Sequence, residues 1–161
     1  MPTLFTEVYD RFFDKITDDM YVELTEQDTK KDCQSLLINS ITKFEFPKTS
    51  LTYHKEDFSL DPYFDDESQF DNSLSDEEID ILANLMVSNW LQRQIMSIDN
   101  TRQQYYGNSF KLTSQASHLN TLVKLKEDLD KDIKKQQRLY GRRQIDQDGK
   151  VASAWAVFNT Y

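Results

Sequence analysis

Apolar side chains recur every three or four residues along most of this chain, and this spacing predicts long amphipathic helices. The clearest helix begins after Ser75, because Ser75 and Glu78 have the spacing of a capping box. We expect this helix to end near Asp99–Asn100. Its apolar face is broad and consists of Ile79, Ile81, Leu82, Leu85, Met86, Trp90, Leu91, Ile95 and Ile98. A stripe of this width indicates a helix buried between several others or within an oligomer.

A second long helix is expected from about Ser114 to Tyr140, with Gly141 as its C-cap residue. Its opposite face alternates Lys, Asp and Gln, which is typical of a solvated or coiled-coil-like helix. Residues 101–119 link the two long helices. The apolar positions of the second helix are Leu119, Leu122, Leu125 (or Val123), Leu129, Ile133 and Tyr140.

Two shorter helices are expected before these. Thr3 or Pro2 opens the first helix, over residues 3–16. Thr25 is the expected N-cap of the second, with Asp28 three residues later, and that helix stops at Phe46–Pro47. The apolar positions are Leu4, Val8 (or Phe5, Tyr9), Phe12 and Ile16 in the first helix, and Leu36, Leu37, Ile41 and Phe44 in the second.

Residues 48–74 show no helical period. Single aromatic residues alternate there with acids, and Pro62 argues against a helix. An insert of this length inside a compact domain is usually functional or mobile. We expect it to be exposed and anchored only through its aromatic side chains, because burial of an unpaired charge is costly.

The chain closes on a segment that differs from the helices before it. After Gly141, residues 144–151 predict a short hairpin around Asp148–Gly149, followed by an apolar end that contains Trp155 and Phe158. Aromatic residues and Arg are concentrated at protein interfaces. We therefore expect residues 142–161 to form an interaction arm.

Together these patterns predict an all-α fold. A small helical bundle over residues 1–141, with its core in residues 3–46 and 75–141, carries a long irregular acidic insert at about 48–74. An extended C-terminal arm or hairpin follows over 142–161. Only 3 Gly and 3 Pro in 161 residues favour long helices over a turn-rich sandwich.

Charge is distributed unevenly around a net value of −9. Residues 56–80 contain 11 acids and no Lys or Arg, whereas residues 81–161 contain 12 basic and 7 acidic residues. Lys124, Lys126, Lys131, Lys134, Lys135, Arg138, Arg142 and Arg143 could contact phosphates, although acids interleave with them as on an ordinary mixed face. Arg138, Arg142 and Arg143 are the least neutralised, so they fit an acidic partner surface at least as well as DNA.

The sequence contains few features that are typical of an enzyme. A lone Cys33 lies mid-helix and is expected to be packed, and His54 and His118 stand in unrelated settings. Gly-rich phosphate loops, HExxH and CxxC motifs are missing. Asp65, Asp66 and Glu67 could offer oxygen ligands to Mg²⁺ or Ca²⁺, but a solvated acidic loop is the simpler interpretation. We therefore predict no enzyme activity, no catalytic or metal site and no cofactor.

No signal peptide and no apolar stretch of about 18 residues is evident, so we expect a cytosolic protein or one in a particle assembled in the cytosol, without membrane contact. We expect Tyr105 and Tyr106 either to pack within a loop or to join an interface. The candidate interaction residues are Arg138, Arg142, Arg143, Trp155, Phe158, Tyr105 and Tyr106.

Four segments carry a resemblance to a known family. They are LFTEVYDRFFDKITDD, LSDEEIDILANLMVSNWLQRQI, TRQQYYGNSFKLTSQASHLNTLVKLKE and RLYGRRQIDQDGKVASAWAVF. In these hydrophobic patterns the chain resembles the head–tail connector (adaptor or neck) proteins of tailed bacteriophages of low-GC Gram-positive hosts. The resemblance covers most of the chain, but the acidic insert departs from the minimal bundle.

The resemblance implies a structural virion protein, located in the neck between capsid and tail and assembled in the host cytoplasm. It implies a dodecameric ring that lies beneath the portal protein, continues the DNA channel and contacts tail or further neck proteins. DNA would pass without sequence-specific binding, because like charge in an acidic lumen repels its backbone. The candidate acids for that face are Asp61, Asp65, Asp66, Glu67 and Asp71.

Two other classes of function remain open. An acidic DNA-mimic or inhibitor protein could bind a DNA-binding enzyme through residues 56–80, as a monomer or dimer in a salt-sensitive complex. A metal-dependent phosphodiesterase could use acids of the same stretch, and a chelator would abolish its activity. Subunit stoichiometry would distinguish a connector from both.

Overall fold

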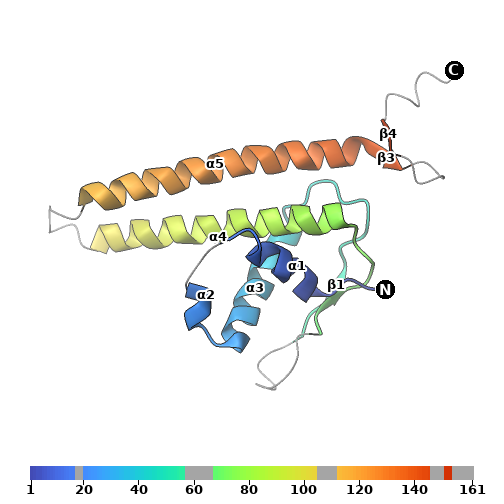
Figure 1. Ribbon diagram of the computed structural model, residues 1–161, viewed down its shortest axis with the longest axis horizontal. Coiled ribbons are helices and arrows are strands. Elements are labelled where there is room, and N and C mark those ends of the chain that lie inside the picture. Colours follow the sequence, from blue (N-terminus) through green and yellow to red (C-terminus); the bar gives the residue numbers. More distant parts are fainter. Residues whose placement is uncertain (17–19, 57–66, 105–111, 146–150, 154–161) are drawn as a thin grey trace.

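The computed structural model describes residues 1–16, 20–56, 67–104, 112–145 and 151–153. The described chain is mostly helical, as the sequence predicts, and consists of α1 (Phe5–Phe13), α2 (Met20–Glu23), α3 (Glu26–Ile41), α4 (Asp76–Gln104) and α5 (Leu112–Arg142) (Figure 1). Two short antiparallel strand pairs accompany the helices. They are β1 (Tyr53–His54) with β2 (Gln69–Phe70), and β3 (Arg143–Ile145) with β4 (Val151–Ser153).

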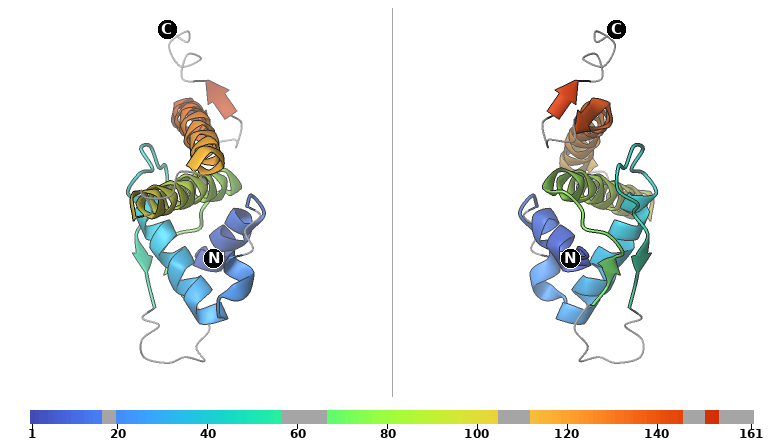
Figure 2. Two further views of the ribbon diagram at one scale, coloured as in Figure 1. Left: turned by 90° about the vertical axis from the view of Figure 1, so that its left-hand side faces the viewer. Right: turned by 90° about the vertical axis from the view of Figure 1, so that its right-hand side faces the viewer.

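The helices form layers around α4. The two long helices α4 and α5 run antiparallel, and α1 and α3 pack on the other side of α4 from α5 (Figures 1 and 2). The core lies mainly between α1, α3 and α4, and its fully buried large side chains include Phe5, Phe12, Leu36, Leu37, Ile81, Leu82 and Met86. The broad apolar face predicted for α4 is thus explained by neighbours on two sides.

Local capping starts the helices where the sequence predicts in two cases. Thr25 Oγ1 accepts the Asp28 N–H at 3.2 Å, which confirms the predicted cap of α3. The Ser75–Glu78 capping box at the start of α4 is also confirmed. The prediction for α1 was wrong, because Leu4 is its N-cap and Thr3 is occupied elsewhere. Thr3 Oγ1 accepts the Leu74 N–H at 2.8 Å and so holds the N-terminus against the segment before α4.

Both long helices exceed their predicted bounds. α4 continues to Gln104, past Asp99–Asn100, and α5 begins at Leu112. Gly141 lies within α5 rather than capping it, since the helix continues to Arg142 and leads directly into β3. A Cβ on Gly141 would lie 3.2 Å from Phe46 Cβ, so the glycine permits close approach of the two segments.

The expected apolar face of α5 needs one correction. Leu119, Ile133 and Tyr140 are buried as predicted, but Leu125 is 54% exposed. α5 packs on α4 along the face that carries Leu119, Ile133 and Tyr140, and Leu125 projects to one side of that face. Among the described residues, no helix has the length and apolar content needed to cross a membrane.

The flanks of the acidic insert belong to the fold, which corrects the predicted core limits. Phe70 is fully buried and packs on Phe5 with ring centroids 4.9 Å apart. Backbone bonds also hold this segment, from Phe70 N–H to Thr3 O at 2.9 Å and from Phe5 N–H to Ser68 O at 2.9 Å. Anchoring by aromatic side chains alone was therefore wrong, since the chain here also satisfies its backbone groups by pairing. Residues 57–66 lie outside the described part of the chain.

Candidate interaction surface

The first turn of α4 carries a buried carboxylate, that of Glu78, which is 1% exposed. Its Oε2 accepts hydrogen bonds from Ser75 N–H at 2.8 Å and Ser75 Oγ at 2.9 Å. In return the Glu78 N–H donates to Ser75 Oγ at 3.3 Å. These reciprocal bonds satisfy backbone donors that the start of a helix leaves without partners.

Glu78 also joins two segments that are distant in sequence. Tyr140 Oη, at the end of α5, donates to Glu78 Oε1 at 2.6 Å. The Thr49 N–H donates to the same oxygen at 3.1 Å, and Thr49 Oγ1 to Oε2 at 3.2 Å. One carboxylate therefore fastens the start of α4, the end of α5 and the segment after α3; we call this group the Glu78 latch.

The latch shifts the acidity of both its main partners. Burial acts to raise the pKa of Glu78, but hydrogen bonds from Tyr140, Ser75 and Thr49 outweigh it, so the pKa lies below its usual range. Burial raises the pKa of Tyr140, and the hydrogen bond to the Glu78 carboxylate raises it further. Tyr140 thus stays a donor and Glu78 an acceptor at neutral pH.

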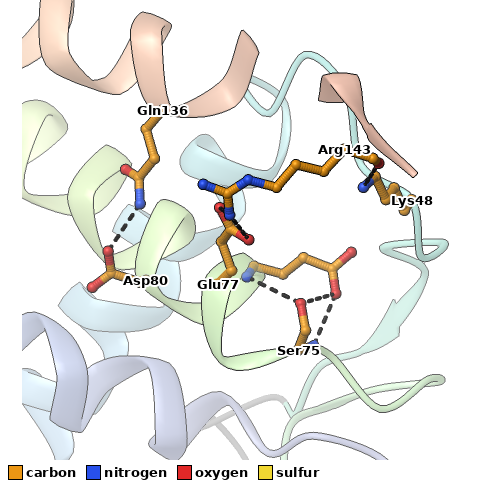
Figure 3. A network of polar contacts seen from close by, with 7 residues as sticks. Lys48, Ser75, Glu77, Asp80, Gln136 and Arg143 are labelled. Carbon is orange, nitrogen blue, oxygen red and sulfur yellow. Dashed lines mark hydrogen bonds and ion pairs between the residues drawn. The ribbon is translucent and has the colours of Figure 1, made fainter. Parts of the chain in front are cut away.

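Arg143 extends the latch to β3. Its Nη1 lies 2.8 Å and 2.9 Å from the two carboxylate oxygens of Glu77 (Figure 3). Lys48 Nζ donates to the Arg143 carbonyl and lies 4.6 Å from the Tyr140 ring centroid. An acid of the 56–80 stretch is therefore the partner of Arg143, but within the same chain.

Polar side chains also line the contact between α4 and α5. Asn84 Nδ2 donates to Gln136 Oε1 at 2.9 Å, and Gln136 Nε2 donates to Asp80 Oδ2 at 3.0 Å. Asp80 also accepts from Lys15 Nζ of the α1 end at 2.6 Å. Burial acts to raise the Asp80 pKa, but the bonds from Lys15 and Gln136 hold it below its usual range. Asp80 thus ties α4 to elements on both of its sides.

Asp130, which precedes Gln136 in α5, also ties α5 to α4. Its carboxylate accepts from Ser88 Oγ at 2.5 Å and from Lys126 Nζ at 2.6 Å, and these bonds lower its pKa against the opposing effect of burial. Asp130 is thus turned toward α4 and is occupied there. It does not neutralise the outward face of α5, although the sequence had suggested that it could.

The outward face of α5 is basic over its last three turns. Its cations lie three or four residues apart, so they share the face opposite Ile133 and Tyr140. All are exposed, and we call them the basic stripe: Lys131, Lys134, Lys135, Arg138 and Arg142. Only Lys131 has an ion pair with another described residue, Asp128 at 3.1 Å. Arg138 and Arg142 of the predicted interaction set belong to this stripe.

α1 carries the opposite charge on its own outward face. Glu7, Asp10 and Asp14 are exposed at helical spacing, opposite the buried residues of α1. The Asp76 side chain is 97% exposed and lies 4.0 Å from Arg11 Nη2. We call Glu7, Asp10, Asp14 and Asp76 the acidic stripe. Sequence reasoning missed it, although the spacing of its α1 members was a usable signal.

The other predicted site residues are not brought together in the described chain. Glu67 is exposed, and Asp71 lies 3.3 Å from His54 Nε2 beside the β1–β2 pair. The remaining predicted residues lie outside the described ranges: Tyr105, Tyr106, Trp155, Phe158, Asp61, Asp65 and Asp66.

The described residues include a free cysteine and open hollows lined by charged side chains. Cys33 is fully buried within α3, as predicted for a packed helical cysteine. Within the described ranges, no three His, Cys, Asp or Glu side chains converge as metal ligands would. An open hollow of about 390 Å³ beside the latch is lined by Glu77, Glu78 and Arg143, whose charges already have partners. The two charged stripes are the places on the described surface where exposed charges of one sign gather.

Comparison with known protein families, with curated proteins and with solved structures found no match to this chain.

Proposed function

We propose that this chain is a head–tail connector of a tailed bacteriophage. Copies of it would form a ring, dodecameric by analogy with the family it resembles, that joins the portal protein to the tail and continues the DNA channel. Its place would be the neck of the virion, after assembly in the host cytoplasm. It would act through contacts with its own copies, the portal and tail or further neck proteins, without catalysis or a cofactor.

The observation that carries this proposal is the placement of opposite charges on two sides of one elongated helical unit. The basic stripe lies on α5, and the acidic stripe lies along α1 with Asp76 at the start of α4, while the body of α4 separates α1 from α5 (Figure 2). A subunit with unlike faces can contact its neighbours head to tail, and such contacts close into rings when the rotation permits. The resemblance in sequence supplies the biological setting.

The described acids support the DNA-mimic alternative less well than the connector proposal. A mimic presents its carboxylates to a partner, but several acids of residues 56–80 are used within the chain. Glu77 binds Arg143, Glu78 is buried in the latch, and Asp80 binds Lys15 and Gln136. The connector proposal therefore accounts better for these residues.

A stop codon in the corresponding gene tests the proposal. We expect DNA-filled heads and separate tails in the infected cells, and joined particles again when the protein is supplied from a plasmid. Electron microscopy with a gold-labelled antibody should then place the protein at the neck. Normal yields of complete particles without the protein would contradict the proposal.

A further inference from the structure

The basic stripe is an unusual feature for a chain with a net charge of −9. It presents five cations along about 16 Å of helix axis, at a rise of about 1.5 Å per residue. Lys134, Lys135, Arg138 and Arg142 have no ion pair with any other residue that the structure describes. Charges that have no partner among the described residues and lie on one face favour an anionic surface on a partner.

The charge of this protein helps to choose between DNA and another protein as the anionic partner of the basic stripe. A DNA backbone would approach a protein whose total charge repels it, which works against binding at long range. A second copy offers the needed anions locally, because its acidic stripe holds four exposed carboxylates, of which Asp76 lies 4.0 Å from the Arg11 side chain. The two stripes also lie on helices that pack on different sides of α4 (Figure 2).

Two copies could meet through like stripes or through unlike stripes, and the charges favour unlike stripes. Two copies that met through the same basic stripe would place like charges together, and this costs free energy. Contact between unlike stripes avoids the repulsion, and it leaves one stripe of each kind open at the ends of the pair. Such a contact is heterologous, so it continues from copy to copy.

We propose that the basic stripe on α5 of one copy docks on the acidic stripe around α1 of the next copy. This inference rests on the proposed function and names the surfaces through which the ring closes. Lys134 and Arg138 lie at the centre of the basic stripe, and Asp10 and Asp14 lie within the acidic one.

Charge reversal in the full chain tests the contact. At low salt the unchanged protein should associate as its concentration rises, with the mass measured by sedimentation velocity. Lys134→Glu with Arg138→Glu should weaken association by about tenfold or more, and so should Asp10→Lys with Asp14→Lys. The control Lys31→Glu with Lys55→Glu makes the same change in net charge as Lys134→Glu with Arg138→Glu, on exposed residues outside both stripes, and it should associate like the unchanged protein.

Mixing provides the decisive result. The two reversed variants should each remain largely monomeric, yet an equimolar mixture should associate, because each variant supplies the stripe that matches the other. Circular dichroism of each variant establishes that it is folded. A folded mixture that fails to associate would overturn the proposal.

The remaining outcomes separate this inference from the proposed function. If the stripe variants still form rings and joined particles, the ring stands and the assigned surfaces are wrong. If the unchanged protein stays monomeric but binds double-stranded DNA through Lys134 and Arg138, the occupant is nucleic acid and the inference is wrong. If the stripe variants alone lose particle assembly while association between copies is unchanged, the occupant is another neck protein and the inference is again wrong.

Discussion

Tyr140 Oη donates a hydrogen bond of 2.6 Å to Glu78 Oε1 across 62 residues of sequence. Both side chains are buried, and the bond joins the end of α5 to the first turn of α4. The same carboxylate caps α4 through Ser75 and holds Thr49. Glu78 is therefore one of the residues that fix α5 against α4, and with it the position of the basic stripe, together with the Asp80–Gln136 and Asp130–Ser88 bonds.

Removing the Tyr140 hydroxyl should destabilise the fold. Tyr140→Phe leaves a buried carboxylate oxygen with one donor fewer, and we expect the free energy of unfolding to fall by about 1–3 kcal/mol. Urea unfolding followed by circular dichroism measures the change. Tyr53→Phe, a half-buried ring outside the latch, is the matched control and should lose less. Equal losses in both variants would show that the latch bond contributes nothing special.

Acid should destabilise the protein through three carboxyl groups. The pKa values of Glu78, Asp80 and Asp130 are lowered in the folded state, so the unfolded chain binds protons more readily. Their contribution to stability is full above the unfolded pKa values, near 4.5 for Glu78 and 3.8 for the two aspartates. It is lost as the pH falls through the lower, folded values.

The urea midpoint measured from pH 7 to pH 3 tests this dependence. Asp80→Asn with Asp130→Asn should make the fall below pH 5 shallower, whereas the exposed control Asp76→Asn should leave it nearly unchanged. An identical pH profile in the double variant and the unchanged protein would rule out these carboxyl groups as the cause.

The flank of the acidic insert should be essential for stability. Phe70→Ala removes a fully buried ring that contacts Phe5, and we expect a loss of about 3–5 kcal/mol in the free energy of unfolding. Phe46→Ala is the control, because that ring is 50% exposed. Thermal unfolding should separate the two variants clearly. If Phe70→Ala lowered the free energy of unfolding only slightly, the flank of the insert would not be important for the stability of the fold.

Truncation after Arg142 should affect assembly more than folding. It keeps the Tyr140–Glu78 bond but removes the Arg143–Glu77 ion pair, whose partly exposed geometry contributes about 1 kcal/mol or less, and the Arg143 carbonyl that accepts from Lys48 Nζ. We therefore expect a small drop in melting temperature together with loss of incorporation into particles. Arg143→Ala in the full chain should reproduce the part of the drop that is due to the ion pair. If the truncated chain unfolds, residues 143–161 are part of the core. If it still assembles into infectious particles, the prediction that these residues form an interaction arm is wrong.

The sequence by itself determined the features whose causes lie within a few residues. The caps at Thr25 and Ser75 depend on side chains that reach a backbone N–H three residues on, and both were predictable. The existence of the four longer helices and the burial of Cys33 follow from apolar spacing along one segment. The paired strands β3 and β4 also lie where a local hairpin pattern indicated them.

Tertiary structure decided everything that depends on partners far along the chain. Thr3 was expected to cap α1, but its hydroxyl accepts the Leu74 N–H instead. Phe70 was expected in an exposed insert, but its ring packs on Phe5. Likewise Asp130 turns inward to Ser88, which leaves the outward face of α5 basic. Charges and apolar residues in a sequence show which groups need partners, but only packing selects the partners, since burial and hydrogen bonding act through space rather than along the chain.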